Sequence, residues 1–301
     1  MFRVSFPMSS VVDYSAFTVS SGTSLRVYDG GYVYKIDHYG VEGIVEELVS
    51  VFMSATDLPD GFYLNYESGI VDVLNSDGSI SYSANACRSA NMESDGSLIK
   101  EMESFYGEQT GMSLDMQMYR FQEIGEEPSA VRWVEEYVRN RVGFEPGNMF
   151  GVLAQLDYII LNSDRSFRNI AFRFGPDGSR GWSKIFDNGK SLFNTRGALP
   201  RSYAEAKEMV SGRVFQPFFN NPRQGFLYFL KERGPAFHVD MDSFRERVGG
   251  LDGRIRDFWC THFLLSRVEQ LISEFPVISS AGLSRTVVPV MRAEPLLGKR
   301  F

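Results

Sequence analysis

The chain contains few residues of the kinds that build disulfide frameworks or metal centres. Its 301 residues include two cysteines, Cys87 and Cys260, and three histidines. A disulfide scaffold needs more cysteines, so we expect a protein of a reducing compartment, the cytoplasm. Cys260 and His262 are close in sequence, but they supply only two of the four ligands of a structural zinc site. We therefore expect a fold that is stabilised by its core rather than by cross-links.

A basic surplus and a long apolar run are also missing. The net charge is -7, whereas nucleic-acid-binding proteins usually carry excess positive charge, so we expect no direct nucleic-acid binding. No run of about 18 apolar residues occurs, so we expect no membrane-spanning helix. Hydrophobic residues still make up 43% of the chain, which is enough for a packed core in one large or two smaller domains.

The first third of the chain has the pattern of strands with tight turns and one helix. In SLRVYDGGYVYKID, apolar and aromatic residues flank Asp29-Gly30-Gly31, which predicts a β-hairpin. The segment VEGIVEELVSVFMSA, residues 41–55, repeats apolar residues at intervals of three and four, which predicts an amphipathic helix. A second hairpin is expected in GIVDVLNSDGSISYSA, with its turn at Asp77-Gly78.

After about residue 90 the pattern becomes mainly helical. One helix is expected between Pro128 and Gly143, and another over residues 148–162. A short strand pair, NIAFRF and WSKIF, follows, and residues 203–275 are expected to be mostly helix. This order indicates an α+β fold of two lobes, with a strand-rich N-lobe over residues 1–88 and a larger helical C-lobe over residues 89–301. A cleft between two lobes is a common ligand site.

Three polar residues between positions 156 and 193 indicate phosphoryl-transfer chemistry. Asp164 and Asn169 are five residues apart, and Asp187 follows a strand and precedes Asn188-Gly189. Phosphoryl transfer requires a carboxylate that orients the nucleophile and oxygen ligands that hold Mg²⁺. We interpret Asp164 as the catalytic residue and Asn169 and Asp187 as metal ligands. Each motif alone is weak evidence, because Asp and Asn also occur in turns, where they bond their own backbone.

Lys35, at the end of the strand YVYKID, is a candidate for binding the phosphates of ATP. A strand lysine paired with a helix glutamate is a recurring part of kinase sites. Glu42 and Glu46 of the following helix are four residues apart and share a face, so either could be the partner, and we favour Glu46. Gly22, in VSSGTSLRV, lies among small residues whose backbone amides could approach phosphates, although an ordinary loop explains the segment equally well.

Taken together, five segments resemble the HipA-like serine/threonine kinase family, in particular its compact bacterial members. The segments occur in the family's order and are YVYKIDHYGVEGIVEELVS, NACRSANM, LDYIILNSDRSFRNIAFRF, SKIFDNGKSLF and VFQPF. The resemblance implies a bilobal protein-kinase-like fold, ATP and Mg²⁺ as cofactors, and transfer to a serine or threonine hydroxyl of a protein. It also implies catalysis by Asp164, metal binding by Asn169 and Asp187, and nucleotide binding by Lys35. Family members can accompany small DNA-binding partners in toxin–antitoxin systems, but nothing in this sequence shows such a partner or identifies the protein substrate.

One position departs from the family pattern. Members usually carry D-R-H-x-x-N, and here Ser166 stands in place of the histidine. A serine can still bond backbone groups but cannot stack or carry charge. A pseudokinase, or a regulatory module that binds nucleotide without transfer, is therefore an alternative. A small-molecule phosphotransferase is a further alternative, although Asn162-Ser163 replace the His-Gly that often precedes the aspartate in such enzymes.

Overall fold

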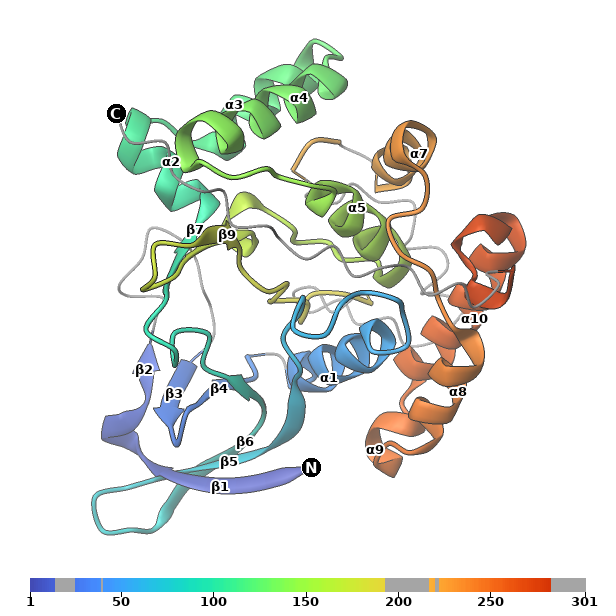
Figure 1. The fold of residues 1–301 in the computed structure, drawn as a ribbon. Helices are drawn as coiled ribbons and strands as arrows, with labels where there is room; N and C mark the ends of the chain where they lie inside the picture. Colours follow the sequence, from blue (N-terminus) through green and yellow to red (C-terminus); the bar gives the residue numbers. More distant parts are fainter. Residues whose placement is uncertain (14–24, 39, 193–216, 220–221, 283–301) are drawn as a thin grey trace.

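The computed structural model describes residues 1–13, 25–38, 40–192, 217–219 and 222–282 (Figure 1). Strands dominate the first part of the chain and helices the last. The N-terminal elements are β1 (Phe2–Pro7), β2 (Val12–Asp13), β3 (Leu25–Asp29), β4 (Tyr32–Ile36), α1 (Glu42–Met53), β5 (Glu67–Leu74) and β6 (Ile80–Ala90). The expected boundary after residue 88 lies near the end of β6.

The N-terminal strands form one curled six-stranded sheet in the order β1-β5-β6-β4-β3-β2 (Figure 1). Only β1 runs parallel to its neighbour, β5, and the other pairs are antiparallel. Both expected hairpins are present, as β3–β4 and β5–β6. Gly30 and Gly31 have φ of +56° and +81°, because a two-residue hairpin turn needs positive φ at both positions.

Helix α1 packs closely against this sheet. Its apolar face is buried, as the spacing of its hydrophobic residues predicts. The close approach depends on Gly43, since a Cβ atom there would lie 2.6 Å from the carbonyl oxygen of Ala86 in β6. The helix therefore has a fixed distance from the sheet, and this distance sets the position of Glu46.

The remaining elements form the larger, mainly helical part. The strands β7 (Leu98–Glu101), β8 (Ala171–Phe174) and β9 (Arg180–Trp182) make a small sheet in that order. In the described ranges its helices are α2 (Met102–Thr110), α3 (Leu114–Glu123), α4 (Glu127–Tyr137), α5 (Met149–Ile160), α7 (Pro222–Arg233), α8 (Met241–Gly249), α9 (Gly253–Arg256) and α10 (Trp259–Glu274). A π-helical turn, Val138–Val142, extends α4 to Gly143.

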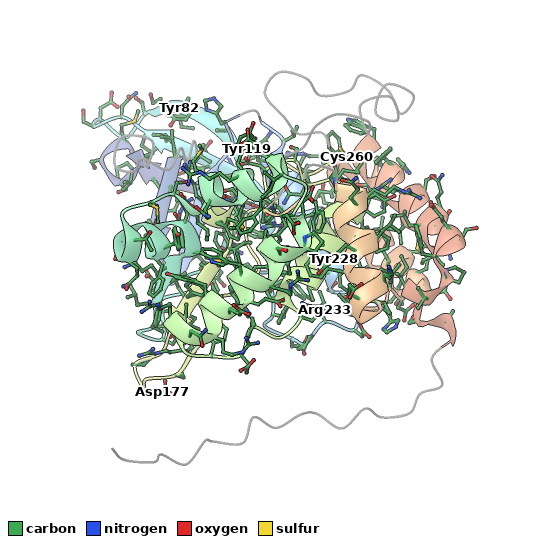
Figure 2. The ribbon with its side chains drawn as sticks, turned by 90° about the horizontal axis from the view of Figure 1, so that it is seen from above. Tyr82, Tyr119, Asp177, Tyr228, Arg233 and Cys260 are labelled. Carbon is green, nitrogen blue, oxygen red and sulfur yellow. The ribbon has the colours of Figure 1, made fainter. Side chains whose placement is uncertain are left out.

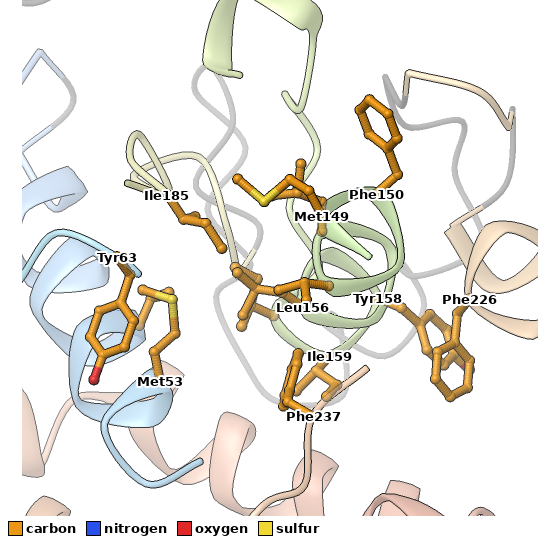
Figure 3. Packing of buried hydrophobic residues seen from close by; sticks show 14 of the residues in the cluster. Met53, Tyr63, Met149, Phe150, Leu156, Tyr158, Ile159, Ile185, Phe226 and Phe237 are labelled. Carbon is orange, nitrogen blue, oxygen red and sulfur yellow. The ribbon is translucent and has the colours of Figure 1, made fainter. Parts of the chain in front are cut away.

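One hydrophobic core joins α1 to the helical part. Met53 and Tyr63 belong to the same buried cluster as Leu156 and Ile159 of α5 (Figure 3). Helix α5 is buried along almost its whole length, which explains why its sequence is apolar on every side.

Helix α1 is also attached at its C-terminal end to the region around α8. The rings of Phe52 and Phe244 pack edge to face with their centroids 5.3 Å apart. The amide of Asp240 donates a 2.8 Å hydrogen bond to the carbonyl oxygen of Ala55. The orientation of α1 is therefore set from two directions, by the sheet and by the C-terminal helices.

The structure differs from the sequence-based expectation at the strand pair that precedes Asp187. The second strand was expected over WSKIF, residues 182–186, but β9 ends at Trp182. Ile185 instead exchanges hydrogen bonds with the backbone of Phe62 and Leu64, both of 2.9 Å. The residues before Asp187 are thereby hydrogen-bonded to the segment that follows α1. No local sequence pattern indicates this pairing.

Cys260 and His262 belong to α10, and the Cys260 side chain is buried within the helical part (Figure 2). No group of three or more His, Cys, Asp or Glu residues that could hold a metal ion occurs in the described ranges. Across the same part of the chain, no helix is sufficiently long and apolar to cross a membrane.

Candidate functional site

A cavity of about 370 Å³ lies between the N-terminal sheet and the helical part. Five of the residues selected from the sequence line it, namely Lys35, Glu46, Asp164, Asn169 and Asp187. They come from β4, α1, the loop after α5 and the segment after β9. We call residues 162–169 the Asp164 loop and residues 186–192 the Asp187 segment. The sixth selected residue, Gly22, lies outside the described residues.

Lys35 is the centre of an ion-pair cluster on the sheet side of the cavity. Its Nζ lies 2.9 Å from Oε1 of Glu46 and 2.8 Å from Oδ1 of Asp187. Burial would lower the pKa of Lys35, but the charges of Asp187 and Glu46 outweigh it and raise the pKa well above its usual range. Lys35 is therefore a permanent cation, and the expectation that it pairs with Glu46 rather than Glu42 is confirmed.

Glu46 connects α1 to the Asp187 segment as well as to β4. Its Oε2 accepts a 2.9 Å hydrogen bond from the amide of Asn188. Burial raises the pKa of Glu46, although the charge of Lys35 opposes this shift. The carboxylate has partners on both oxygens, as a buried charge requires.

Asp187 presents an ionised carboxylate to the cavity. Burial alone would raise its pKa, but Lys35, Arg26 and Lys190 outweigh it and lower the pKa to about 2. Its φ of +59° places it in the left-handed region, which few residues other than glycine adopt. Such strained backbone is concentrated at functional sites. The turn directs Asp187 toward Lys35 while Asn188 bonds Glu46.

The Asp164 loop is held in shape by its own side chains. Asn162 Oδ1 accepts a hydrogen bond of 3.0 Å from the amide of Asp164, and Asn169 Nδ2 donates one of 2.6 Å to the Asp164 carbonyl. Ser166 accepts two further hydrogen bonds. Its carbonyl oxygen accepts one of 3.0 Å from the amide of Asn169, and its Oγ accepts one of 3.3 Å from the amide of Arg168. Ser166 thus caps the short turn that carries Asn169, so the loop is supported without a histidine at this position.

Two functional candidates escaped the sequence analysis. Arg165 is completely buried and bonds Asp157 of α5 as well as the backbone of both loop and Asp187 segment. The sequence feature that could have indicated a buried partner is Asp157, a lone carboxylate within an apolar helix.

The second candidate is Lys190, whose Nζ lies 2.7 Å from Oδ2 of Asp164. The sequence feature that could have indicated Lys190 as a site residue is its position, three residues after Asp187.

The residues present are chemically suited to Mg²⁺. Magnesium usually takes only one or two protein carboxylates and completes its coordination with water and substrate phosphates. Asp187 offers an ionised carboxylate, and Asn169 has its amide nitrogen engaged by the Asp164 carbonyl, which leaves its Oδ1 as the potential ligand.

Comparison with solved structures shows the fold. The chain is similar to the Helicobacter pylori proinflammatory kinase CtkA, with a TM-score of 0.54 and 12% sequence identity over 90% of this chain and 94% of that chain. No protein-family model and no curated protein matches the sequence. The expected bilobal kinase-like fold, with a strand-rich N-terminal part and a helical C-terminal part, is confirmed.

Proposed function

We propose that this chain is an ATP-dependent phosphotransferase of the protein-kinase type, which transfers the γ-phosphoryl group of ATP to a serine or threonine hydroxyl of a protein. The observation that carries the proposal is the convergence of Lys35, Glu46, Asp164, Asn169 and Asp187 on one cavity. The kinase-like fold supports phosphoryl transfer in general. The resemblance to HipA-like kinases supports a protein acceptor, and the low cysteine count supports a cytoplasmic location.

Each residue has a role that follows from its position. Lys35 binds the α- and β-phosphates, and Glu46 keeps its ammonium group in place. Asp187 and Asn169 would hold Mg²⁺, which when bound neutralises charge on the phosphates. Asp164 orients the acceptor hydroxyl and takes its proton. These roles leave positioning and electrostatic stabilisation as the main sources of rate enhancement, as is typical of phosphoryl transfer.

Ser166 bears on the alternative of a nucleotide-binding protein without activity. Because Ser166 caps the turn that carries Asn169, the Asp164 loop retains the hydrogen bonds that position both residues. The structural support for the loop is therefore intact, which favours an active enzyme over a pseudokinase.

The proposal is tested by incubating the purified protein with γ-labelled ATP and Mg²⁺. We expect label on the wild-type protein and none on Asp164→Ala. Asp177→Ala is the matched control, because Asp177 lies in the exposed turn between β8 and β9 (Figure 2) and does not line the cavity. Nucleotide binding without any phosphoryl transfer would identify a pseudokinase. ATP consumption that labels a small molecule but no protein would identify a small-molecule phosphotransferase.

A further inference from the structure

Lys190 contacts one of the two carboxylates on which the proposed function depends, Asp164, and its charge acts on the other, Asp187. Its Nζ is 2.7 Å from Oδ2 of Asp164, and its positive charge contributes to the lowered pKa of Asp187. Lys190 also lines the cavity. The ammonium group therefore occupies the part of the cavity where the acceptor, the metal and the transferred group would meet.

The backbone of Lys190 is attached to the Asp164 loop. The hydroxyl of Ser163 donates a 3.1 Å hydrogen bond to the carbonyl oxygen of Lys190. The amide of Leu192 donates one of 2.9 Å to the carbonyl of Ile160 at the end of α5. Lys190 is thus positioned by the same structure that positions Asp164, and its place in the cavity follows from the fold.

The ion pair between Lys190 and Asp164 contributes little to stability. The two side chains are 33% and 42% exposed, and exposed pairs of this kind stabilise proteins weakly. Lys35, by contrast, is only 16% exposed and is shared between two carboxylates. Within the described residues, the ammonium of Lys190 bonds only Asp164. An ammonium has three donor hydrogens, so two remain for a ligand.

We propose that Lys190 binds the γ-phosphoryl group of ATP and stabilises it during transfer. The inference rests on the proposed function. In this step the acceptor oxygen forms a bond to the γ-phosphorus, and the bond from that phosphorus to the β–γ bridging oxygen breaks. The bonding electron pair leaves with ADP, and the acceptor proton passes to Asp164. The γ-phosphoryl oxygens would otherwise bring negative charge close to the Asp164 carboxylate. The ammonium group of Lys190 offsets the repulsion between these two groups.

The experiment compares the binding of two nucleotides that differ in the γ-phosphoryl group. The Mg²⁺ complexes of ADP and of the non-hydrolysable ATP analogue AMP-PNP are titrated calorimetrically into the wild type, Lys190→Met and Lys190→Arg. Lys184→Met is the control, because Lys184 is an exposed lysine of the same stretch of chain that does not line the cavity. Transfer rates and melting temperatures are measured on the same samples.

We expect Lys190→Met to lose about tenfold or more of the preference for AMP-PNP over ADP, since a hydrogen bond to a charged group is removed. ADP affinity and melting temperature should match the wild type, and the transfer rate should fall by about 10²–10³. Lys190→Arg should keep most of the preference, and Lys184→Met all of it.

Two results overturn the inference. An unchanged preference in Lys190→Met, with wild-type transfer, would show that Lys190 does not contact the γ-phosphoryl group and would leave the proposed function intact. An equal loss of ADP and AMP-PNP affinity would assign Lys190 a general role in the shape of the cavity. If the wild type binds neither nucleotide, the proposed function fails together with the inference.

Discussion

Arg165 and Asp157 form an ion pair that is buried beneath the Asp164 loop. Nε and Nη2 of Arg165 lie 3.0–3.2 Å from the carboxylate oxygens of Asp157, and neither side chain is more than 1% exposed. The same guanidinium donates to the carbonyl of Phe186 at 2.9 Å and to Oδ1 of Asn188 at 2.6 Å. Arg165, which directly follows Asp164, therefore links the Asp164 loop to α5 and to both neighbours of Asp187.

Removal of Arg165 should destabilise the whole protein. In Arg165→Met the carboxylate of Asp157 remains buried without its cation, which typically costs about 3–5 kcal/mol. The control is Arg139→Met, whose partner Glu145 is 75% exposed, and a change within about 0.5 kcal/mol is expected there. Urea unfolding of the two variants measures the difference. Equal stability would show that the buried pair does not hold the site together.

Two helical glycines should respond oppositely to alanine. In Gly43→Ala the new methyl group would lie 2.6 Å from the Ala86 carbonyl, so α1 must shift, and we expect a loss of about 1–3 kcal/mol. In Gly107→Ala, in α2, the nearest atom is 3.6 Å away, and a gain of up to about 1 kcal/mol is expected from helix propensity. Thermal unfolding followed by circular dichroism measures both changes. A stabilised Gly43→Ala variant would contradict the close packing of α1 on the sheet.

Asp37 should make the stability of the protein depend on pH. Burial and the nearby charge of Glu42 raise the pKa of Asp37 to about 7, although the amide of Gly43 donates a hydrogen bond to it. The folded protein therefore binds a proton more tightly than the unfolded chain, whose aspartate titrates near pH 4. The contribution of Asp37 to stability is greatest at low pH and is lost as pH rises from about 4 to 7.

The variant Asp37→Asn removes this titration while keeping an oxygen for Gly43. At pH 8 we expect its free energy of unfolding to exceed that of the wild type by only about 1–2 kcal/mol, because water screens the partly exposed carboxylate of Asp37. At pH 4 the two proteins should be nearly equal in stability. Urea unfolding at the two pH values measures the difference. A variant that is no more stable than the wild type at pH 8 would show that Asp37 is ionised in the fold without penalty.

The parts of the molecule that follow local rules were predictable from the sequence. The hairpin at Gly30-Gly31 and the helix that carries Glu46 each have a short, self-contained pattern. The sequence left Glu42 and Glu46 open as partners of Lys35 and favoured Glu46, which is the partner that the structure shows. The kinase-like fold was indicated by five ordered segments, none of which was sufficient alone.

The parts that depend on distant segments were not predictable. The parallel pairing of β1 with β5 and the attachment of Ile185 to the segment after α1 join residues that are far apart in the chain. The partners of Arg165 likewise come from α5 and the Asp187 segment, so its sequence neighbours do not reveal its burial. The proposed nucleotide role of Gly22 stays a prediction, because that residue lies outside the described ranges.

Asp187→Asn should separate metal binding from backbone shape. Asparagine tolerates the left-handed conformation, so the turn at φ +59° is preserved while the negative charge is lost. We expect ATP binding by the wild type to strengthen when Mg²⁺ is added and binding by the variant to respond much less. Calorimetric titrations with Mg²⁺ and with EDTA measure this difference. An equal Mg²⁺ response in both proteins would exclude Asp187 as a metal ligand.

The roles of Asp164 and of the nucleotide site are tested together by measuring nucleotide binding and phosphoryl transfer on the same preparations of wild type and Asp164→Ala. We expect both proteins to bind Mg²⁺-ATP with similar affinity, because Asp164 acts on the acceptor hydroxyl. We also expect only the wild type to transfer labelled phosphate at a measurable rate, with a fall of at least about 10²-fold in the variant. Transfer by Asp164→Ala at the wild-type rate would exclude Asp164 as the catalytic residue, and a wild type that binds no Mg²⁺-ATP would rule out a nucleotide site in this cavity.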